Sequence, residues 1–209
     1  MPISVSVKNR TCLVVGGGEV ALRKVETLLD YDTTITVIAP EAHDKLKYHA
    51  SRERITLEER EYRSPEAADY GMVISASDDS GINRKVYEDS RGAGVLVNVV
   101  DDPFHCDFIF PAVLRRDCLT AAISTDGMAP FMSGHLRIVL ENIFPKHWDK
   151  LMKLAASFRK MVRERWGSDT SKKNACYGEF LDADWKTMLK DMSDTEIKQE
   201  LTRMMGVPE

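Results

Sequence analysis

Apolar and polar residues alternate along the first half of the chain with the periods of strands and helices. Helical spacing of apolar positions occurs at residues 19–29 and 82–90. Short apolar runs rich in valine and isoleucine predict parallel strands at residues 12–15, 34–38, 72–76 and 95–99, with a weaker signal at 55–59. Strands that alternate with helices in this way predict an α/β class, with a doubly wound, Rossmann-type parallel sheet over residues 1–113.

The pattern changes in the second half. Two β-type runs, at residues 108–113 and 118–124, are joined by 114–117 and predict an antiparallel hairpin. A long helix is expected from about Pro130. From residue 145 the chain has a helical pattern to its end, with a polar break at 167–174. We therefore expect a small β subdomain at residues 114–144 and a C-terminal helical module at residues 145–209.

Three glycines stand directly between the first predicted strand and the first predicted helix. Gly16, Gly18 and Ala21 fit the G-x-G-x-x-A pattern of a dinucleotide-binding turn. Gly16 permits the tight turn, Gly18 lets a diphosphate approach the backbone, and Ala21 lets the helix pack closely on the strand. The helix N-terminus offers free N–H groups to the phosphates. Glycine-rich turns also close ordinary βα units, so the motif alone leaves both interpretations open.

The second predicted strand lacks the usual acidic residue that holds the cofactor's ribose. It runs instead into Ala39, Pro40 and Glu41. Glu41 can take this role from a slightly later position, or the backbone of Pro40 and Glu41 can hold the ribose. No arginine stands there to meet a 2′-phosphate, which favours NAD over NADP.

The composition is ordinary for a globular protein and argues against several classes of function. Of 209 residues, 43% are hydrophobic and 30% are charged, and the net charge of −4 argues against a general nucleic-acid-binding role. The chain has no apolar run that could span a membrane and no signal-peptide pattern, so we expect a cytoplasmic location. The four cysteines match no zinc-binding spacing, and no metal site is predicted.

Further motifs occur in a characteristic order after the glycines. They are Ser75–Ser80, Asn83, Val97–Asp101, Pro103, Phe108, Pro111–Ala112, Leu119, Ile123–Gly127, Pro130 and Leu136–Arg137. With Val15–Ala21 in front of them, the chain resembles the precorrin-2 dehydrogenase family, which also forms the N-terminal half of multifunctional siroheme synthases. The resemblance covers roughly residues 3–165. No methyltransferase domain follows, so the chain is expected to be the stand-alone form.

The resemblance implies NAD-dependent oxidation of precorrin-2 to sirohydrochlorin by a homodimer whose small β subdomain mediates dimerisation. It assigns catalysis to Asp101, which can serve as the general base. The expected cofactor contacts are Gly16, Gly18, Glu19, Val20, Ala21, Pro40, Glu41, Ser77 and Asn98. The expected substrate contacts are Ser124, Thr125 and Arg137.

Each of these roles has a structural alternative. Asp101 can cap a turn that Asp102 and Pro103 make, and Ser124 and Thr125 can cap the loop before the long helix. A basic stripe that includes Arg159, Lys160 and Arg163 can be a solvated helix face or a wall for an acidic substrate.

Two other functions also remain open. One is a bifunctional dehydrogenase and sirohydrochlorin ferrochelatase. The other is a non-catalytic module that senses NAD. The sequence departs from the family at Ala129 and at 132–135, which bears more on the chelatase than on the dehydrogenase.

Overall fold

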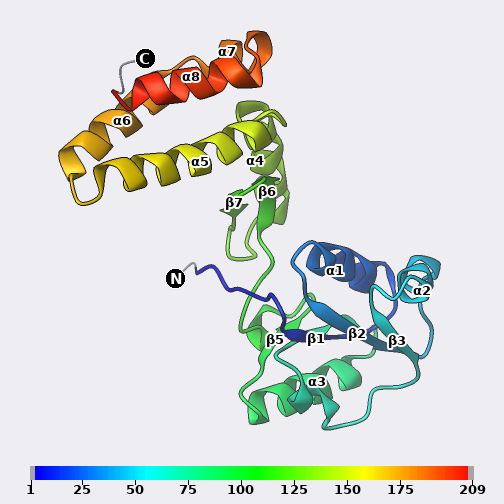
Figure 1. Cartoon of the computed structure of the whole chain (residues 1–209). Coiled ribbons are helices and arrows are strands. Elements are labelled where there is room, and N and C mark those ends of the chain that lie inside the picture. The colour runs from blue at the N-terminus through cyan, green and yellow to red at the C-terminus, as the bar shows by residue number, and fades with distance from the viewer. Residues whose placement is uncertain (1–2, 207–209) are drawn as a thin grey trace. The chain divides into compact units, whose positions relative to one another are not determined.

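The first unit of the chain is built on a five-stranded sheet in which all strands run parallel (Figure 1). The computed structural model describes residues 3–206 and divides them into two units, with the boundary between Ile109 and Phe110. The strands lie in the order β3-β2-β1-β4-β5. Their bounds are β1 Thr11–Val15, β2 Thr34–Ala39, β3 Thr56–Glu59, β4 Met72–Ser75 and β5 Leu96–Val99. This is the strand order of a Rossmann-type sheet, so the predicted fold class is confirmed.

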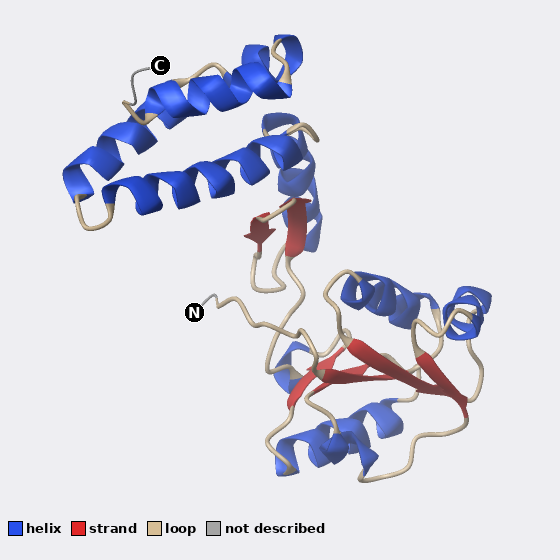
Figure 2. Cartoon of the chain, viewed as in Figure 1, coloured by secondary structure: helices blue, strands red, loops and turns tan. Residues whose placement is uncertain are grey.

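Helices cover both faces of this sheet (Figures 1 and 2). α1 (Glu19–Leu29) and α2 (Asp44–Ser51) lie on one face, and α3 (Ser80–Gly92) lies on the other. Two short 3₁₀ turns, η1 (Glu66–Asp69) and η2 (Pro103–His105), complete the unit. Because both faces are covered, residues 12–15 of the central strand β1 are all apolar and buried, and only Thr11 at its start is exposed.

The second unit begins with the hairpin of β6 (Ala112–Arg116) and β7 (Leu119–Ile123), which pair antiparallel. The predicted hairpin is present, but its first strand was placed wrongly. Residues 114–116, expected in the connection, belong to β6, and only Asp117 and Cys118 form the turn. Asp117 has φ 52°, a left-handed conformation that aspartate tolerates in such turns. The arginines that resemble a loop in the sequence pair with Thr120 and Leu119.

Five helices follow the hairpin, with bounds α4 Pro130–Ile143, α5 Trp148–Trp166, α6 Thr170–Asp182, α7 Trp185–Asp191 and α8 Asp194–Met204. α4 contacts both strands of the hairpin, and the later helices enclose an apolar core of their own. Its centre is formed by Phe158, Val162, Ile197 and Leu201, each no more than 3% exposed. The second unit thus has a hydrophobic core that is separate from that of the sheet.

The polar break that was predicted at 167–174 is shorter than expected. Gly167 ends α5 with φ 45°, and the side chain of Asp169 caps α6 by accepting a hydrogen bond from the Lys172 N–H. Residues 170–174 are therefore helical, despite their polar composition. The prediction missed this first turn because its residues are polar and show no helical spacing of apolar positions. The Asp169 cap nevertheless starts the helix there.

The boundary between the two units falls after residue 109, whereas the sequence placed one after 113. The further division into a β subdomain and a helical module at residue 144 stays a prediction. None of the helices described between residues 3 and 206 is long and apolar enough to cross a lipid bilayer.

The buried core of the helical module leads to a stability prediction. Leu201 is 3% exposed in this core, whereas Leu181, on α6, is 78% exposed. Leu201→Ala should lower the free energy of unfolding by about 2–5 kcal/mol, because it removes buried apolar surface and leaves a cavity. Leu181→Ala, the matched control, should change it by less than about 0.5 kcal/mol. Urea unfolding followed by circular dichroism measures both, and equal effects would contradict the assigned core.

Candidate cofactor-binding and active site

The glycine turn after β1 is held tightly between the ends of β2 and β4. The Gly16 N–H donates to the Ile38 carbonyl at 2.9 Å, and the Ala76 N–H donates to the Val15 carbonyl at 2.7 Å. Gly16 has φ 124°, and a Cβ added to it would lie 2.2 Å from the Ala76 carbonyl oxygen. Only glycine fits here, for its conformation as well as its size.

Gly17 is constrained from the other side, by the segment that follows β2. A Cβ on Gly17 would lie 2.0 Å from the Glu41 carbonyl oxygen, and the His43 N–H donates to the Gly17 carbonyl at 2.8 Å. The turn is therefore fixed by backbone contacts with both neighbouring strand ends. Sequence reasoning gave Gly17 no role, because it occupies a variable position of the motif.

Gly18 is constrained by neither neighbour. A Cβ added there would meet no heavy atom of the described residues within 4 Å. Gly18 is the N-cap of α1, where it has no side chain to occupy the first N–H groups of the helix, those of Glu19, Val20 and Ala21. Ala21 is fully buried, as expected for close helix–strand packing. Open space, free N–H groups and a positive helix end together fit a diphosphate.

The residues expected near the ribose lie beside this turn. Pro40 and Glu41 follow the end of β2 and are both exposed, and the Glu41 backbone lies against Gly17. Glu19 at the start of α1 is paired with His43, whose Nε2 lies 3.3 Å from the carboxylate. The structure thus brings the glycine turn and the Pro40–Glu41 segment to one edge of the sheet. Both ways of holding the ribose, by the Glu41 carboxylate or by backbone groups, are compatible with this placement.

Ser77 lies in the segment after β4, on the opposite side of the turn. Its N–H donates to the Asn83 side chain at 3.2 Å, and the Asn83 amide donates to the Ser77 carbonyl at 2.8 Å. The Ser75 hydroxyl also donates to Asn83, at 2.7 Å. Asn83 therefore holds the whole segment that meets Gly16 at Ala76. Sequence reasoning listed Asn83 in the family pattern but gave it no function.

Asp101 stands at the tip of a tight segment after β5. It is exposed and has φ 61°, a left-handed conformation that is uncommon for residues other than glycine. The Cys106 sulfur lies 3.1 Å from the Val99 carbonyl and 3.2 Å from that of Asp102, within hydrogen-bond distance of both. The segment therefore folds back on itself and presents the Asp101 side chain outward.

Asn98, predicted to contact the cofactor, is only 6% exposed. Its amide donates to the Phe108 carbonyl at 2.8 Å and to the Cys106 sulfur at 3.3 Å. These bonds tie the two ends of the Asp101 segment together. The geometry gives Asn98 a structural task, and its contact with a cofactor stays a prediction.

Asp101 interacts electrostatically with Lys24. Burial and the charge of Arg23 lower the pKa of Lys24, on α1, whereas the negative charge of Asp101 acts in the opposite direction. Asp102 is bonded to the His105 ring at 2.5 Å, which holds the pKa of the Asp102 carboxyl below its ordinary value. Asp102 is thus committed to His105, while Asp101 faces a lysine that the sequence pattern did not single out.

The three expected substrate contacts lie in the second unit. The Ser124 hydroxyl accepts from the Asp126 N–H and the Thr125 hydroxyl accepts from the Ala129 N–H, both at 3.1 Å. These are the capping bonds of the structural alternative. The guanidinium of Arg137, on α4, is paired with Glu141 one turn later. Between residues 3 and 206, no group of three or more His, Cys, Asp or Glu side chains is arranged to hold a metal ion.

Comparison with known proteins supports a shared ancestry. Residues 3–112 match the family model described as "Putative NAD(P)-binding". The siroheme synthase of Nitrosococcus oceani is 38% identical over 165 residues, which cover 79% of this chain and 35% of that protein. The siroheme synthase of Pseudoalteromonas atlantica is 35% identical over 208 residues, which cover 100% of this chain and 45% of that protein. The chain thus spans less than half the length of these relatives.

A solved structure shares the fold of the whole chain. The protein named "SirC, precorrin-2 dehydrogenase" superposes with a TM-score of 0.79 at 21% identity, over 99% of this chain and 100% of that one. The family model covers more than half of the chain, and it ends where β6 begins. The chain therefore belongs to this NAD(P)-binding family, and its similarity to siroheme synthases confirms the relationship that its sequence motifs indicated.

Proposed function

We propose that the protein is a dehydrogenase that oxidises precorrin-2 to sirohydrochlorin, with NAD as cofactor and Asp101 as general base. The observation that carries this proposal is the arrangement at the carboxyl ends of the strands. The glycine turn follows β1 and Asp101 follows β5, so both belong to the same edge of one parallel sheet. We call Gly18 and the first N–H groups of α1 the diphosphate cradle. Ligands of such sheets bind at this edge.

Cofactor binding and proton transfer are assigned to different residues of the chain. Gly18 and the N–H groups of Glu19, Val20 and Ala21 hold the cofactor's diphosphate, and the Pro40–Glu41 segment holds its ribose. When bound, NAD supplies the acceptor for the hydride that leaves the macrocycle. Asp101 takes the accompanying proton, since its exposed side chain stands at the tip of a rigidly bonded segment.

Lys24 is the positive charge that acts on Asp101 within this unit. Arg137 binds a carboxylate of the substrate by exchanging its bond with Glu141, and Ser124 and Thr125 add hydrogen bonds from the loop before α4. The preference for NAD over NADP rests on the sequence at the end of β2, where Ala39, Pro40 and Glu41 include no arginine that could bind a 2′-phosphate.

The first prediction separates cofactor binding from folding. Gly18→Ala should leave the melting temperature unchanged but weaken NAD binding at least about tenfold, because the new methyl group enters the space where the diphosphate must approach. Gly17→Ala is the comparison variant, and it should lower the melting temperature as well, since its methyl group meets the Glu41 carbonyl. Calorimetric titration with NAD and NADP measures both affinities. Unchanged NAD binding by Gly18→Ala would contradict the cradle.

A second prediction concerns catalysis. Asp101→Asn should reduce NADH formation from precorrin-2 and NAD by about 10²–10⁴-fold, the usual contribution of a general base. NAD affinity should not change, because the side chain is separate from the cradle. Asp102→Asn, at the adjacent position, should retain most activity, since Asp102 is bonded to His105.

The same assay tests the two rival functions. Wild-type protein that binds NAD but forms no NADH would favour the NAD-sensing module. Ferrous iron added to the sirohydrochlorin product tests the bifunctional alternative, in which metal insertion must exceed the rate without protein.

We also propose that the chain forms a homodimer through α4. Several large apolar side chains of this helix are exposed, among them Phe131 at 76%, Ile138 at 51% and Ile143 at 56%. Phe131 and Ile138 are seven residues apart and therefore lie on one helix face. Exposed apolar side chains that gather on one helix face are typical of protein interaction sites.

The third prediction tests this interface. Phe131→Asp combined with Ile138→Asp should convert the dimer to a monomer, because two charges would have to be buried without partners. Leu181→Asp, which changes an equally exposed leucine on α6, is the control and should leave the mass unchanged. Sedimentation equilibrium gives the masses. A wild-type monomer, or a dimer that persists in the double variant, would refute the assignment.

A further inference from the structure

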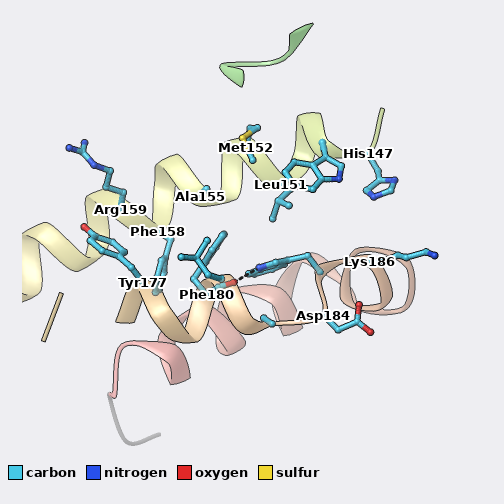
Figure 3. A pocket seen from close by; sticks show the side chains of 14 residues that line it. His147, Leu151, Met152, Ala155, Phe158, Arg159, Tyr177, Phe180, Asp184 and Lys186 are labelled. Carbon is cyan, nitrogen blue, oxygen red and sulfur yellow. Dashed lines mark hydrogen bonds between the residues drawn. The ribbon is translucent and has the colours of Figure 1, made fainter. Parts of the chain in front are cut away.

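A cavity in the helical module has no role in the function proposed above. It has a volume of about 690 Å³ and lies entirely within the second unit, between α5, α6 and the start of α7 (Figure 3). Its walls are mostly apolar, and they include the five aromatic residues Trp148, Phe158, Tyr177, Phe180 and Trp185. The size and lining are those of a small-molecule site, for which 300–1,000 Å³ is the usual range.

The aromatic walls are rigidly held. Phe180 stacks on Phe158 with ring centroids 5.1 Å apart and contacts Trp185 at 4.5 Å. The Trp185 indole N–H donates to the Phe180 carbonyl at 2.6 Å, which fixes the orientation of its ring. These three rings are at most 7% exposed, so a ligand meets mainly the half-buried rings of Trp148 and Tyr177, which can stack on another flat aromatic body. The lining therefore favours a planar ligand over a flexible chain.

Polar groups stand at the two ends of the cavity and differ in character. Figure 3 shows Arg159 and Tyr177 at one end and His147, Asp184 and Lys186 at the other. Within residues 3–206, Arg159 is in no ion pair and the Tyr177 hydroxyl makes no hydrogen bond. Both groups can therefore donate hydrogen bonds to a ligand.

Charge is also distributed unequally between the ends. Arg159 also lines a neighbouring groove, together with Lys160 and Arg163. Glu164 is the acidic residue in the lining of that groove. At the opposite end, the Asp184 carboxylate accepts a hydrogen bond from the Thr187 N–H as the cap of α7 and remains negative. Lys186 stands at the same end as Asp184 and offsets its charge, whereas the Arg159 end of the lining holds no acidic residue, so an anionic group is attracted to Arg159. The cavity thus has a preferred direction for an acid.

We propose that this cavity binds a flat aromatic carboxylic acid, with its rings between the aromatic walls and its carboxylate at Arg159 and Tyr177. The site is independent of the dinucleotide cradle and of Asp101, since all its residues lie in the second unit. It gives the helical module a ligand of its own, whose binding can be measured without substrate or cofactor.

The test uses the full chain and two probes of nearly equal shape. 1-Pyrenebutyrate carries a carboxylate, and 1-pyrenebutanol is its uncharged analogue. Trp148 and Trp185 line the cavity, so a bound pyrene should quench part of the tryptophan fluorescence in a saturable way. The acid should bind more tightly than the alcohol, by about three- to tenfold, as expected for a charge-assisted contact that is partly open to solvent.

Three variants locate the binding. Arg159→Gln should remove the preference for the acid and leave the affinity for the alcohol unchanged. Lys153→Gln removes a charge from the same helix outside the cavity and should have no effect. Ala155→Trp places a large ring among the lining residues and should abolish binding of both probes. Thermal melting of each variant, followed by circular dichroism, verifies that the module is folded.

Several outcomes would overturn the proposal. They are the absence of saturable quenching, equal affinity for the two probes, and binding that survives in folded Ala155→Trp. A loss of dimer mass in Ala155→Trp, measured by sedimentation, would also overturn it, because the cavity would then be covered by a second copy of the chain. The two probes are titrated without NAD or precorrin-2, so failure here is distinct from failure of the proposed dehydrogenase.

Discussion

Close backbone contact at the glycine turn is the constraint on which the first unit depends. Gly16 and Gly17 are held between the Ala76 and Glu41 carbonyls, with no room for a Cβ on either side. This contact brings the segments after β1, β2 and β4 together and leaves Gly18 as the one open position at the start of α1. The same packing that stabilises the sheet edge thus creates the space and the free N–H groups of the proposed cofactor site.

A second rigid segment, after β5, supplies the chemistry at this edge. Asp101 adopts a left-handed conformation because Asn98 and Cys106 fix the chain on both sides of it. Such conformations cost free energy and persist only where the surrounding structure enforces them. The position of Asp101 is therefore determined by buried neighbours, and its exposed side chain remains available to a substrate. Lys24 gives this carboxylate a positive counterpart from α1.

Much of the fold could be predicted from local patterns. Buried parallel strands and α1 follow from apolar runs and from the order of strand, glycines and helix, which are all local features of the sequence. The prediction was wrong at β6 and at the start of α6, where polar residues lie in regular secondary structure. Arg115 and Arg116 belong to the strand, and Thr170 is the first residue of the helix. A two-residue turn at Asp117 and a helix cap at Asp169 determine those boundaries. The spacing of apolar residues in the sequence does not reveal either feature.

The site was predictable only in part. Gly16, Gly18 and Ala21 have roles that follow from their size, so a motif reveals them. Gly17 contacts the segment after β2 and Lys24 interacts electrostatically with Asp101, both far along the chain, and the bonds of Asn83 to Ser75 and Ser77 depend on how the loop after β4 folds. For Arg137 and Thr125 the sequence motifs implied substrate contacts, but in the structure these side chains are bonded to nearby groups of the same unit. Arg137 is paired with Glu141, and Thr125 accepts from the Ala129 N–H.

The most direct test of the account follows the backbone amides of the glycine turn while NAD is added to the full chain. In a ¹⁵N-labelled sample, titration with NAD should shift the amide resonances of Gly18, Glu19 and Val20 most strongly, because these N–H groups are proposed to meet the diphosphate. Saturation should occur at one equivalent. Saturable binding that leaves these three resonances unchanged would place the cofactor elsewhere and contradict the central claim.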